Sequence, residues 1–186
     1  MTSDAASQIA YLARALKAPA LRDSAERLAE RARADGWTHQ EYLAACLEAE
    51  AAARSAHGAA NRTRAAAFPA RKTIEDFDFD HQRSVRRDHI LHLATLDFIT
   101  ARTNIVLLGP PGTGKTMLAT GLGIKACQAG HRVLFATAAA WTDRLTAAHR
   151  AGRLQAEITR LARYPLLVID LSGVPGHPSV TSASVA

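Results

Sequence analysis

The feature that most constrains the fold of this chain is a glycine-rich turn, which joins a short apolar run to a helical stretch. Residues 105–108 are Ile-Val-Leu-Leu, a continuous apolar run typical of a strand buried on both faces. The eight residues after it match G-x-x-x-x-G-K-[ST] at every fixed position. Apolar runs at 133–135 and 166–169 predict two more strands, with helical segments between them. Strands that alternate with helices favour an α/β fold with a parallel sheet.

The turn itself predicts a phosphate-binding loop. Glycines let the backbone curl so that its N–H groups point inward, and the N-terminus of the following helix adds partial positive charge. We expect Lys115 to reach the β- and γ-phosphates of a nucleotide and the Thr116 hydroxyl to bind Mg²⁺. A chance Gly/Pro turn is the alternative, and the place between strand and helix argues against it. The residues expected to bind the cofactor are Gly109, Pro110, Pro111, Gly112, Thr113, Gly114, Lys115 and Thr116.

Asp170 ends the third apolar run. A carboxylate at the C-terminal edge of a parallel sheet lies on the side where nucleotides bind. We therefore expect Asp170 to hold Mg²⁺, directly or through water, together with Thr116. Lys115 and Asp170 are the candidate catalytic residues. An ordinary strand-ending aspartate in a turn is the alternative.

The chain divides into four stretches. Residues 1–60 predict a helical N-terminal module, whose third helix opens at a Thr38–Glu41 capping box and ends near Gly58. We expect residues 61–80 to form a basic linker and docking segment, residues 81–170 the N-terminal part of a P-loop domain, and residues 171–186 an irregular tail.

The linker is basic at its start, with four Lys or Arg and no acid in residues 61–72. It is either a solvated connector or an arm that contacts phosphate. Phe77 and Phe79 are expected to pack on the next domain. Residues 84–99 predict one helix, and three arginines crowd its start, where positive charge opposes the helix dipole and suggests a phosphate partner.

Composition sets the broad class. The chain has 48% hydrophobic and 22% charged residues, which argues against a disordered or fibrous protein. Its net charge of +6 suits an anionic partner, and nucleotide, DNA, RNA and anionic lipid all fit. Cys46 and Cys127 lie too far apart for a zinc or redox motif and are expected to be free thiols. No signal peptide or span of about 20 apolar residues is visible, so we expect a cytoplasmic protein without membrane contact.

Three segments carry a resemblance to a known family. They are the Leu-Leu-Gly-Pro-Pro-Gly-Thr-Gly-Lys-Thr block at 107–116, the segment Ala-Gly-His-Arg-Val-Leu-Phe-Ala-Thr-Ala at 129–138, and Arg-Leu-Ala-Arg-Tyr-Pro-Leu-Leu-Val-Ile-Asp at 160–170. Together they resemble the IstB-like ATP-binding proteins, helpers of insertion-sequence transposition related to the DnaC helicase loaders of the AAA+ superfamily. The resemblance implies an AAA+ type P-loop NTPase behind an all-helical module. It also implies ATP and Mg²⁺ as cofactors, and DNA, a transposase and further copies of the chain as partners.

The resemblance breaks after Asp170. Leu171 stands where the family has a glutamate, and leucine cannot orient or deprotonate the attacking water. The family's sensor strand, arginine finger and second sensor do not follow. We therefore expect impaired hydrolysis, a chain truncated or frameshifted after Asp170, and an incomplete sheet with unpaired backbone groups where the sensor strand would lie.

Two other functions remain open. The chain could be a non-catalytic remnant, acting at most as a DNA- or protein-binding helical module with a vestigial nucleotide site. It could also be another P-loop enzyme, such as a small-molecule kinase. Such an enzyme needs an arginine-bearing lid after the third strand, and the residues after Asp170 contain no arginine. ATP binding by the chain, compared with Lys115→Ala, separates the ATP-binding helper from the remnant.

Overall fold

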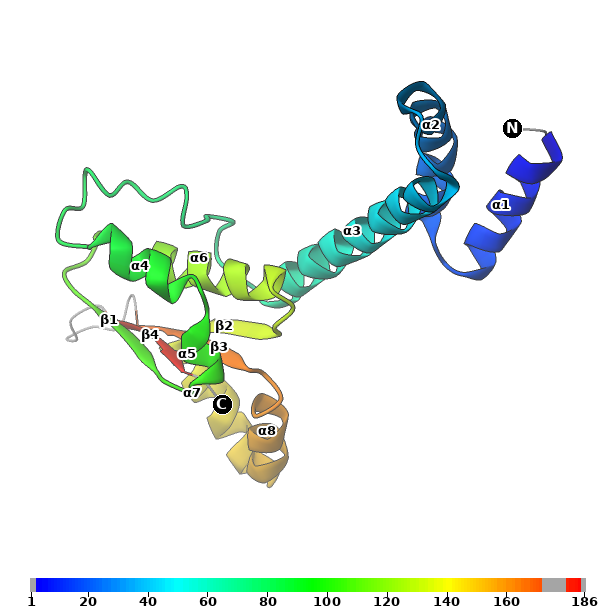
Figure 1. The fold of residues 1–186 in the computed structure, drawn as a ribbon. Coiled ribbons are helices and arrows are strands. Elements are labelled where there is room, and N and C mark those ends of the chain that lie inside the picture. Colours follow the sequence, from blue (N-terminus) through cyan, green and yellow to red (C-terminus); the bar gives the residue numbers. More distant parts are fainter. Residues whose placement is uncertain (1–2, 172–179, 185–186) are drawn as a thin grey trace. The chain divides into compact units, whose positions relative to one another are not determined.

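The computed structural model describes residues 3–171 and 180–184. These fall into two compact units, Met1–His57 and Gly58–Ala186 (Figure 1). In the part of the chain described, no helix is both long and apolar enough to cross a membrane.

The N-terminal unit is helical. It contains α1 (Ser3–Ala15), α2 (Pro19–Asp35) and the first part of α3 (His39–Ala65). The predicted capping box is confirmed at the start of α3. The Thr38 N–H and hydroxyl donate to Glu41 Oε2 at 2.7 and 2.8 Å, and the Glu41 N–H donates to Thr38 Oγ1 at 3.2 Å. Two otherwise unpaired donors are thereby satisfied.

Glu50 ties α3 to the start of α2. Its Oε2 accepts the N–H groups of Ala20 and Leu21 at 3.0 and 3.2 Å, and its Oε1 accepts Arg54 at 3.0 Å. A carboxylate here also complements the positive end of α2. Burial opposes ionisation, but the Leu21, Arg54 and Ala20 donors outweigh it and lower the pKa of Glu50.

The expected end of the third helix near Gly58 was wrong. Helix α3 continues to Ala65, so residues 61–65 are helical where a linker was expected. A glycine inside a helix costs only about 1 kcal/mol relative to alanine. The residues around Gly58 are rich in alanine, the strongest helix former, and they carry the helix through it.

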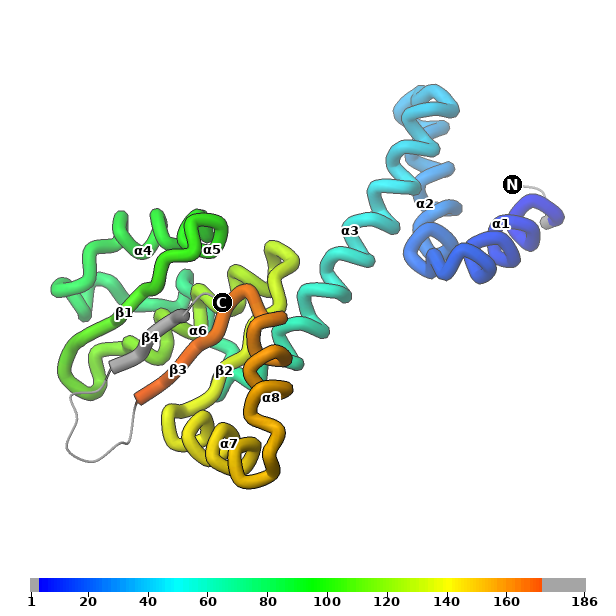
Figure 2. The backbone as a smooth tube through the Cα atoms, turned by 90° about the horizontal axis from the view of Figure 1, so that it is seen from below, coloured from blue at the N-terminus to red at the C-terminus, as the bar shows by residue number. Residues whose placement is uncertain are grey.

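The second unit is built on one four-stranded sheet of order β1-β4-β3-β2 (Figure 2). Strands β2 and β3 pair in parallel, from Val133↔Leu166 to Thr137↔Asp170. Strand β4 is antiparallel to both β1 and β3, so β1, β2 and β3 all run the same way. The strands are β1 (Ile105–Leu108), β2 (Val133–Thr137), β3 (Leu166–Asp170) and β4 (Val180–Ser184). The predicted fold class, a partial P-loop NTPase sheet behind N-terminal helices, is confirmed.

Strand β4 corrects two expectations. Residues 180–184 were expected to be irregular, and the position between β1 and β3 was expected to leave backbone groups unpaired. Instead β4 fills that position, pairing Ile105↔Ala183 on one side and Val168↔Ala183 on the other. Buried backbone N–H and C=O groups require partners, and an antiparallel strand supplies them as well as a parallel one. The remaining tail, residues 172–179 and 185–186, lies outside the described residues.

Five helices accompany the sheet in the described part of this unit: α4 (Arg87–Leu93), α5 (Asp97–Thr100), α6 (Lys115–Gln128), α7 (Ala138–Arg150) and α8 (Leu154–Leu161). The single helix expected over residues 84–99 was wrong. Leu96 has a left-handed conformation with φ 67°, and it separates α4 from α5. Leu96, Phe98 and Ile99 are all buried in the main core. The change of chain direction at Leu96 therefore lets these three neighbouring side chains pack into the same core.

Residues 66–79, here called the strap, run along α6. The Ala66 carbonyl accepts the N–H of Phe135 in β2 at 2.9 Å, and the Phe68 ring meets the Phe135 ring edge-on at 6.1 Å. Further along, Ile74 and Phe77 are buried in a second apolar cluster, and Phe79 packs against it. The expected packing of Phe77 and Phe79 is confirmed. Ala66, Ile74 and Phe77 of the strap are thus part of the second unit's core.

The strap lies so close to α6 that two helix positions must be glycine. A Cβ at Gly121 would lie 2.9 Å from the Ile74 backbone nitrogen, and one at Gly123 would lie 2.7 Å from the Phe68 ring. We expect Gly121→Ala to lower the free energy of unfolding by about 1–3 kcal/mol, because overpacking outweighs the gain in helix propensity. Urea denaturation measures this.

Gly58→Ala is the matched control within α3. Its Cβ would meet only the Arg62 guanidinium, 3.1 Å from Nη1, and a shift of a few tenths of an ångström would relieve this while keeping the Nε bond to the Cys127 carbonyl. That variant should gain about 0.5–1 kcal/mol. Equal stabilisation by both alanines would show that the strap does not press on α6.

The pH dependence of the N-terminal unit should follow Glu50. A folded-state pKa below the ordinary value of 4.5 means that the stabilisation is complete above that pH and is lost as pH falls through the lowered pKa. At neutral pH, Glu50→Gln should therefore lose its helical circular dichroism at a lower temperature than the unmodified chain. Its melting temperature should also fall less when the pH is lowered. The exposed neighbour Glu48, changed to Gln, should leave both unchanged.

Candidate nucleotide site

The turn between β1 and α6 forms an open loop of backbone. Strand β1 ends at Leu108, and α6 begins at Lys115 with Gly114 as its N-cap. Gly112 and Gly114 have φ of 80° and 83°, in the left-handed region that residues with a side chain rarely adopt. The sequence therefore folds here as expected, into a tight curl at the positive end of a 14-residue helix.

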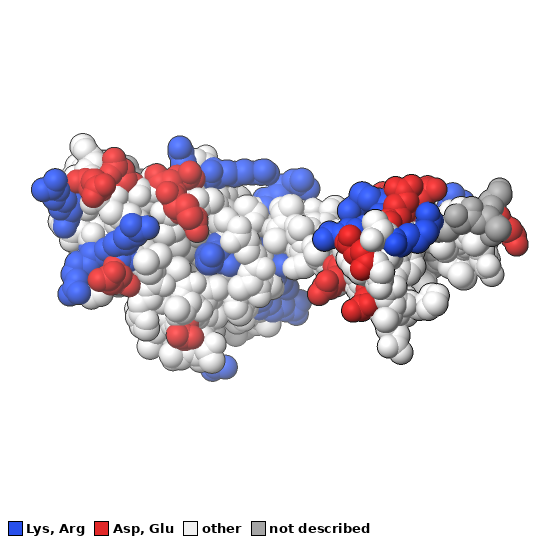
Figure 3. Space-filling view, turned by 45° about the horizontal axis from the view of Figure 1, so that its top comes forward, with Lys and Arg blue, Asp and Glu red and all other residues white. Residues whose placement is uncertain are grey.

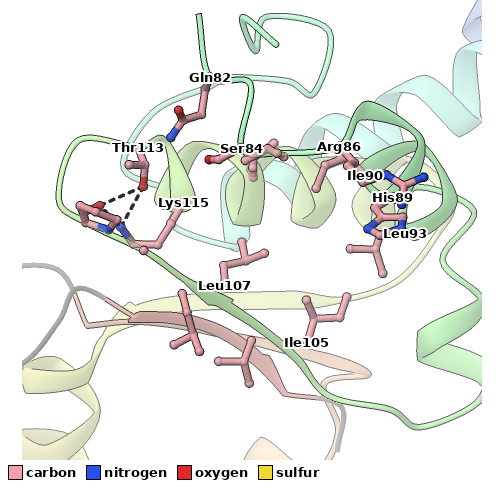
Figure 4. Close-up of a pocket in the computed structure, with 16 residues that line it drawn as sticks. Gln82, Ser84, Arg86, His89, Ile90, Leu93, Ile105, Leu107, Thr113 and Lys115 are labelled. Carbon is pink, nitrogen blue, oxygen red and sulfur yellow. Dashed lines mark hydrogen bonds between the residues drawn. The ribbon is translucent and has the colours of Figure 1, made fainter.

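Lys115 lies inside this curl (Figure 4). Its side chain is buried, and Nζ donates to the Pro110 carbonyl at 2.6 Å and to Thr113 Oγ1 at 3.2 Å. Thr113 Oγ1 in turn donates to the Pro110 carbonyl at 2.9 Å. Pro110 was expected among the cofactor-binding residues, and its carbonyl is the acceptor that holds both side chains. Pro111 is exposed, and no role for it is visible.

Thr116 and Asp170 come together from distant parts of the chain. Thr116 Oγ1 donates to Asp170 Oδ2 at 3.1 Å across 54 residues. Asp170 is 5% exposed and lies at the last pair of the parallel β2–β3 ladder, at the C-terminal edge of the sheet. A hydroxyl and a carboxylate are oxygen ligands of the kind Mg²⁺ prefers, so the donor set fits that ion.

A cavity of about 340 Å³ opens beside the loop. Leu107 and Ile105 of β1 form its floor, and Lys115 and Thr113 stand at one end (Figure 4). The far wall comes from α4 and the segment before it. It carries polar side chains at Gln82, Ser84, Arg86 and His89, and apolar ones at Ile90 and Leu93. The cavity thus joins an apolar floor to a cationic end.

Sequence patterns predicted only part of this cavity. Arg86 is one of the arginines noted at the start of the predicted helix, and it does line the space beside the loop. Gln82, Ser84 and His89 were missed as site residues. Their role depends on how α4 lies over β1, and no local spacing reports that.

The chain is similar to a known family and to several curated proteins. Residues 11–177 match the family model described as IstB-like ATP binding protein. A protein described as the putative ATP-binding protein of insertion sequence IS21 from Pseudomonas aeruginosa is 42% identical over 108 residues, which are 58% of this chain and 41% of the relative. The corresponding protein of IS5376 from Geobacillus stearothermophilus is 41% identical over 105 residues, covering 56% and 42% of the two chains.

A third relative extends the match. A putative insertion sequence ATP-binding protein of Sinorhizobium fredii is 31% identical over 156 residues, 83% of this chain and 52% of its own. The chain therefore spans about half the length of the curated relatives it matches. With a family model matching most of its residues, the chain belongs to the family of IstB-like ATP-binding proteins of insertion sequences.

Proposed function

We propose that this chain binds ATP with Mg²⁺ at residues 109–116 and Asp170, and serves as an AAA+ helper of DNA transposition. The observation that carries the proposal is the convergence of three features at one sheet edge. A buried lysine lies in a glycine curl, a hydroxyl–carboxylate pair at 3.1 Å begins at the next residue of the helix, and a cavity opens beside the lysine.

In this proposal the loop amides and Lys115 Nζ bind the phosphates. Lys115 would exchange its bond to the Pro110 carbonyl for phosphate oxygens, which are stronger, charged acceptors. Thr116 and Asp170 would hold Mg²⁺, which would supply positive charge to offset that of the phosphates. The nucleoside would occupy the cavity over Leu107, where apolar floor and polar wall suit a base and a sugar.

Hydrolysis is proposed to be impaired. Leu171 directly follows Asp170 and is partly buried at the end of β3. A glutamate at this position would orient the attacking water, and an aliphatic side chain neither accepts a proton nor aligns a nucleophile. Binding and turnover are therefore expected to separate in this chain.

Charge favours the second unit as the DNA-binding part. Residues 1–57 carry seven basic and eight acidic side chains, so the whole positive excess lies in residues 58–186. On the face shown in Figure 3, blue and red groups of the N-terminal unit are interspersed. Exposed ion pairs of this unit include Arg22–Asp23 and Arg31–Asp35. In the second unit, exposed arginines lie on and around α7 and α8, at Arg150, Arg153 and Arg163, while Arg160 forms an ion pair with Glu157.

The N-terminal unit suits a protein partner instead. It exposes apolar side chains on α1, in the turn after it and on α3, namely Tyr11, Leu12, Leu16, Leu43 and Leu47. Tyr11 is 72% and Leu16 69% exposed. Large exposed apolar groups on a unit without excess positive charge favour contact with protein over DNA. We assign this face to the transposase, and propose that the chain works in the cytoplasm as a homo-oligomer on DNA.

The alternative is a non-catalytic remnant that uses only its helices to bind DNA or protein. The buried Lys115 and the Thr116–Asp170 pair favour nucleotide binding over it, because burying charged groups is costly and their positions at the loop suit an anionic ligand with a metal ion. Nucleotide binding separates the two functions.

The purified chain should bind ATP with Mg²⁺ in isothermal titration calorimetry. Lys115→Ala should weaken binding about 100-fold, as expected when a charge-assisted hydrogen bond of about 2–3 kcal/mol is removed. Asp170→Asn should reduce the difference between affinities measured with Mg²⁺ and with EDTA. Lys125→Ala, on the same helix away from the loop, is the control. ATP binding by Lys115→Ala equal to the unmodified chain would refute the site.

DNA binding should depend on the arginines of α7 and α8. In fluorescence anisotropy against salt, Arg150→Ala with Arg163→Ala should lower the slope of log K against log salt by about 1 for each phosphate that is no longer neutralised. Arg22→Ala, an exposed and ion-paired arginine of the N-terminal unit, should leave the slope unchanged. A larger effect at Arg22 would place the DNA on the other unit.

A further inference from the structure

Phe77 of the strap packs directly on the glycine that begins the nucleotide-binding helix. A Cβ at Gly114 would lie 2.5 Å from Phe77 Cε2 and 3.4 Å from both Cδ2 and Cζ. The edge of the ring therefore occupies the space next to the Gly114 backbone. Gly114 is the N-cap of α6 and the last residue before Lys115.

The ring is held in place from several sides. Phe77 is 8% exposed and belongs to a buried cluster with Ile90, Leu118 and Leu122. Phe79 meets it edge-on at 4.8 Å. The ring also borders a cavity of about 500 Å³, but its contacts with these buried side chains keep it against the Gly114 backbone.

The strap backbone at this point is also well defined. Asp76 Oδ2 accepts the Thr73 N–H at 2.8 Å and the Thr73 hydroxyl at 3.1 Å, and the Phe77 N–H donates to the Ile74 carbonyl at 3.1 Å. This turn brings Ile74 and Phe77 to α6 together. Ile74 meets Gly121, seven residues or about two helical turns beyond Gly114.

We propose that Phe77 is a positioning residue for the nucleotide site. Its ring holds Gly114 in the left-handed conformation, and through it the loop amides and Lys115, in the arrangement that binds a triphosphate. This inference rests on the proposed ATP binding. Coupling of this kind is reciprocal, so a bound triphosphate must in turn hold the strap against α6.

Phe77→Leu tests the proposal in the full chain. Leucine keeps an apolar side chain but removes the ring atoms that face Gly114. Phe68→Leu is the matched control, because the Phe68 ring covers Gly123 of the same helix in the same way, with Cε1 and Cζ at 2.7 Å from a Cβ there. Both variants should lose similar thermal stability, which differential scanning calorimetry checks.

ATP affinity with Mg²⁺, measured by isothermal titration calorimetry below both melting temperatures, separates positioning from packing. Phe77→Leu should bind ATP about fivefold or more weakly than the unmodified chain, whereas Phe68→Leu should bind normally. Equal affinity of Phe77→Leu and the unmodified chain, or an equally weakened affinity in both variants, would overturn the proposal. Failure of the unmodified chain to bind ATP would instead remove the proposed function, and this inference with it.

Limited trypsin digestion gives a second measurement that needs no substitution. Arg71 and Lys72 are exposed and lie immediately before Thr73 in the strap. ATP with Mg²⁺ should slow cleavage after these two residues in the unmodified chain, and the protection should be smaller in Phe77→Leu. Cleavage at an unchanged rate in saturating ATP would show that the strap and the loop are not coupled.

Discussion

The close approach of the strap to α6 is the constraint on which the second unit depends. A helix that is covered on two faces needs small residues where a backbone passes over it, and Gly121 and Gly123 provide them. Because the strap covers one face and the sheet the other, most side chains of α6 are buried. The helix start, with Lys115 and Thr116, is therefore held next to Asp170 by packing far from the loop itself.

The sheet shows that the demand for paired backbone groups is stronger than the demand for one strand direction. Strands β1 and β3 each present an edge of N–H and C=O groups to the gap between them, and β4 pairs with both. The strand that fills the gap is made of small residues, Val-Thr-Ser-Ala-Ser. Its position follows from the two edges that it joins, and its own sequence shows no alternation that would predict it.

This contrast explains how far sequence reasoning reaches here. The strands at 105–108, 133–135 and 166–169, the capping box and the glycine curl could be predicted because each depends on neighbours in sequence. The break at Leu96 and the passage of α3 through Gly58 could not, since tertiary packing and alanine-rich flanks decide them. The contact between Phe77 and Gly114 could not be predicted either, because only the folded strap brings these two residues together.

Lys115 shows what such a fold prepares in advance. Its ammonium group is already removed from most of its water and held by the Pro110 carbonyl and Thr113. Dehydrating a cation is costly, and here that cost is met when the chain folds rather than when an anion arrives. An incoming phosphate therefore competes with two neutral oxygens instead of a hydration shell. The selectivity of the loop then depends on how much more strongly the Lys115 ammonium group binds a charged oxygen than a backbone carbonyl. Neutral ligands of the same shape therefore gain little by replacing that carbonyl.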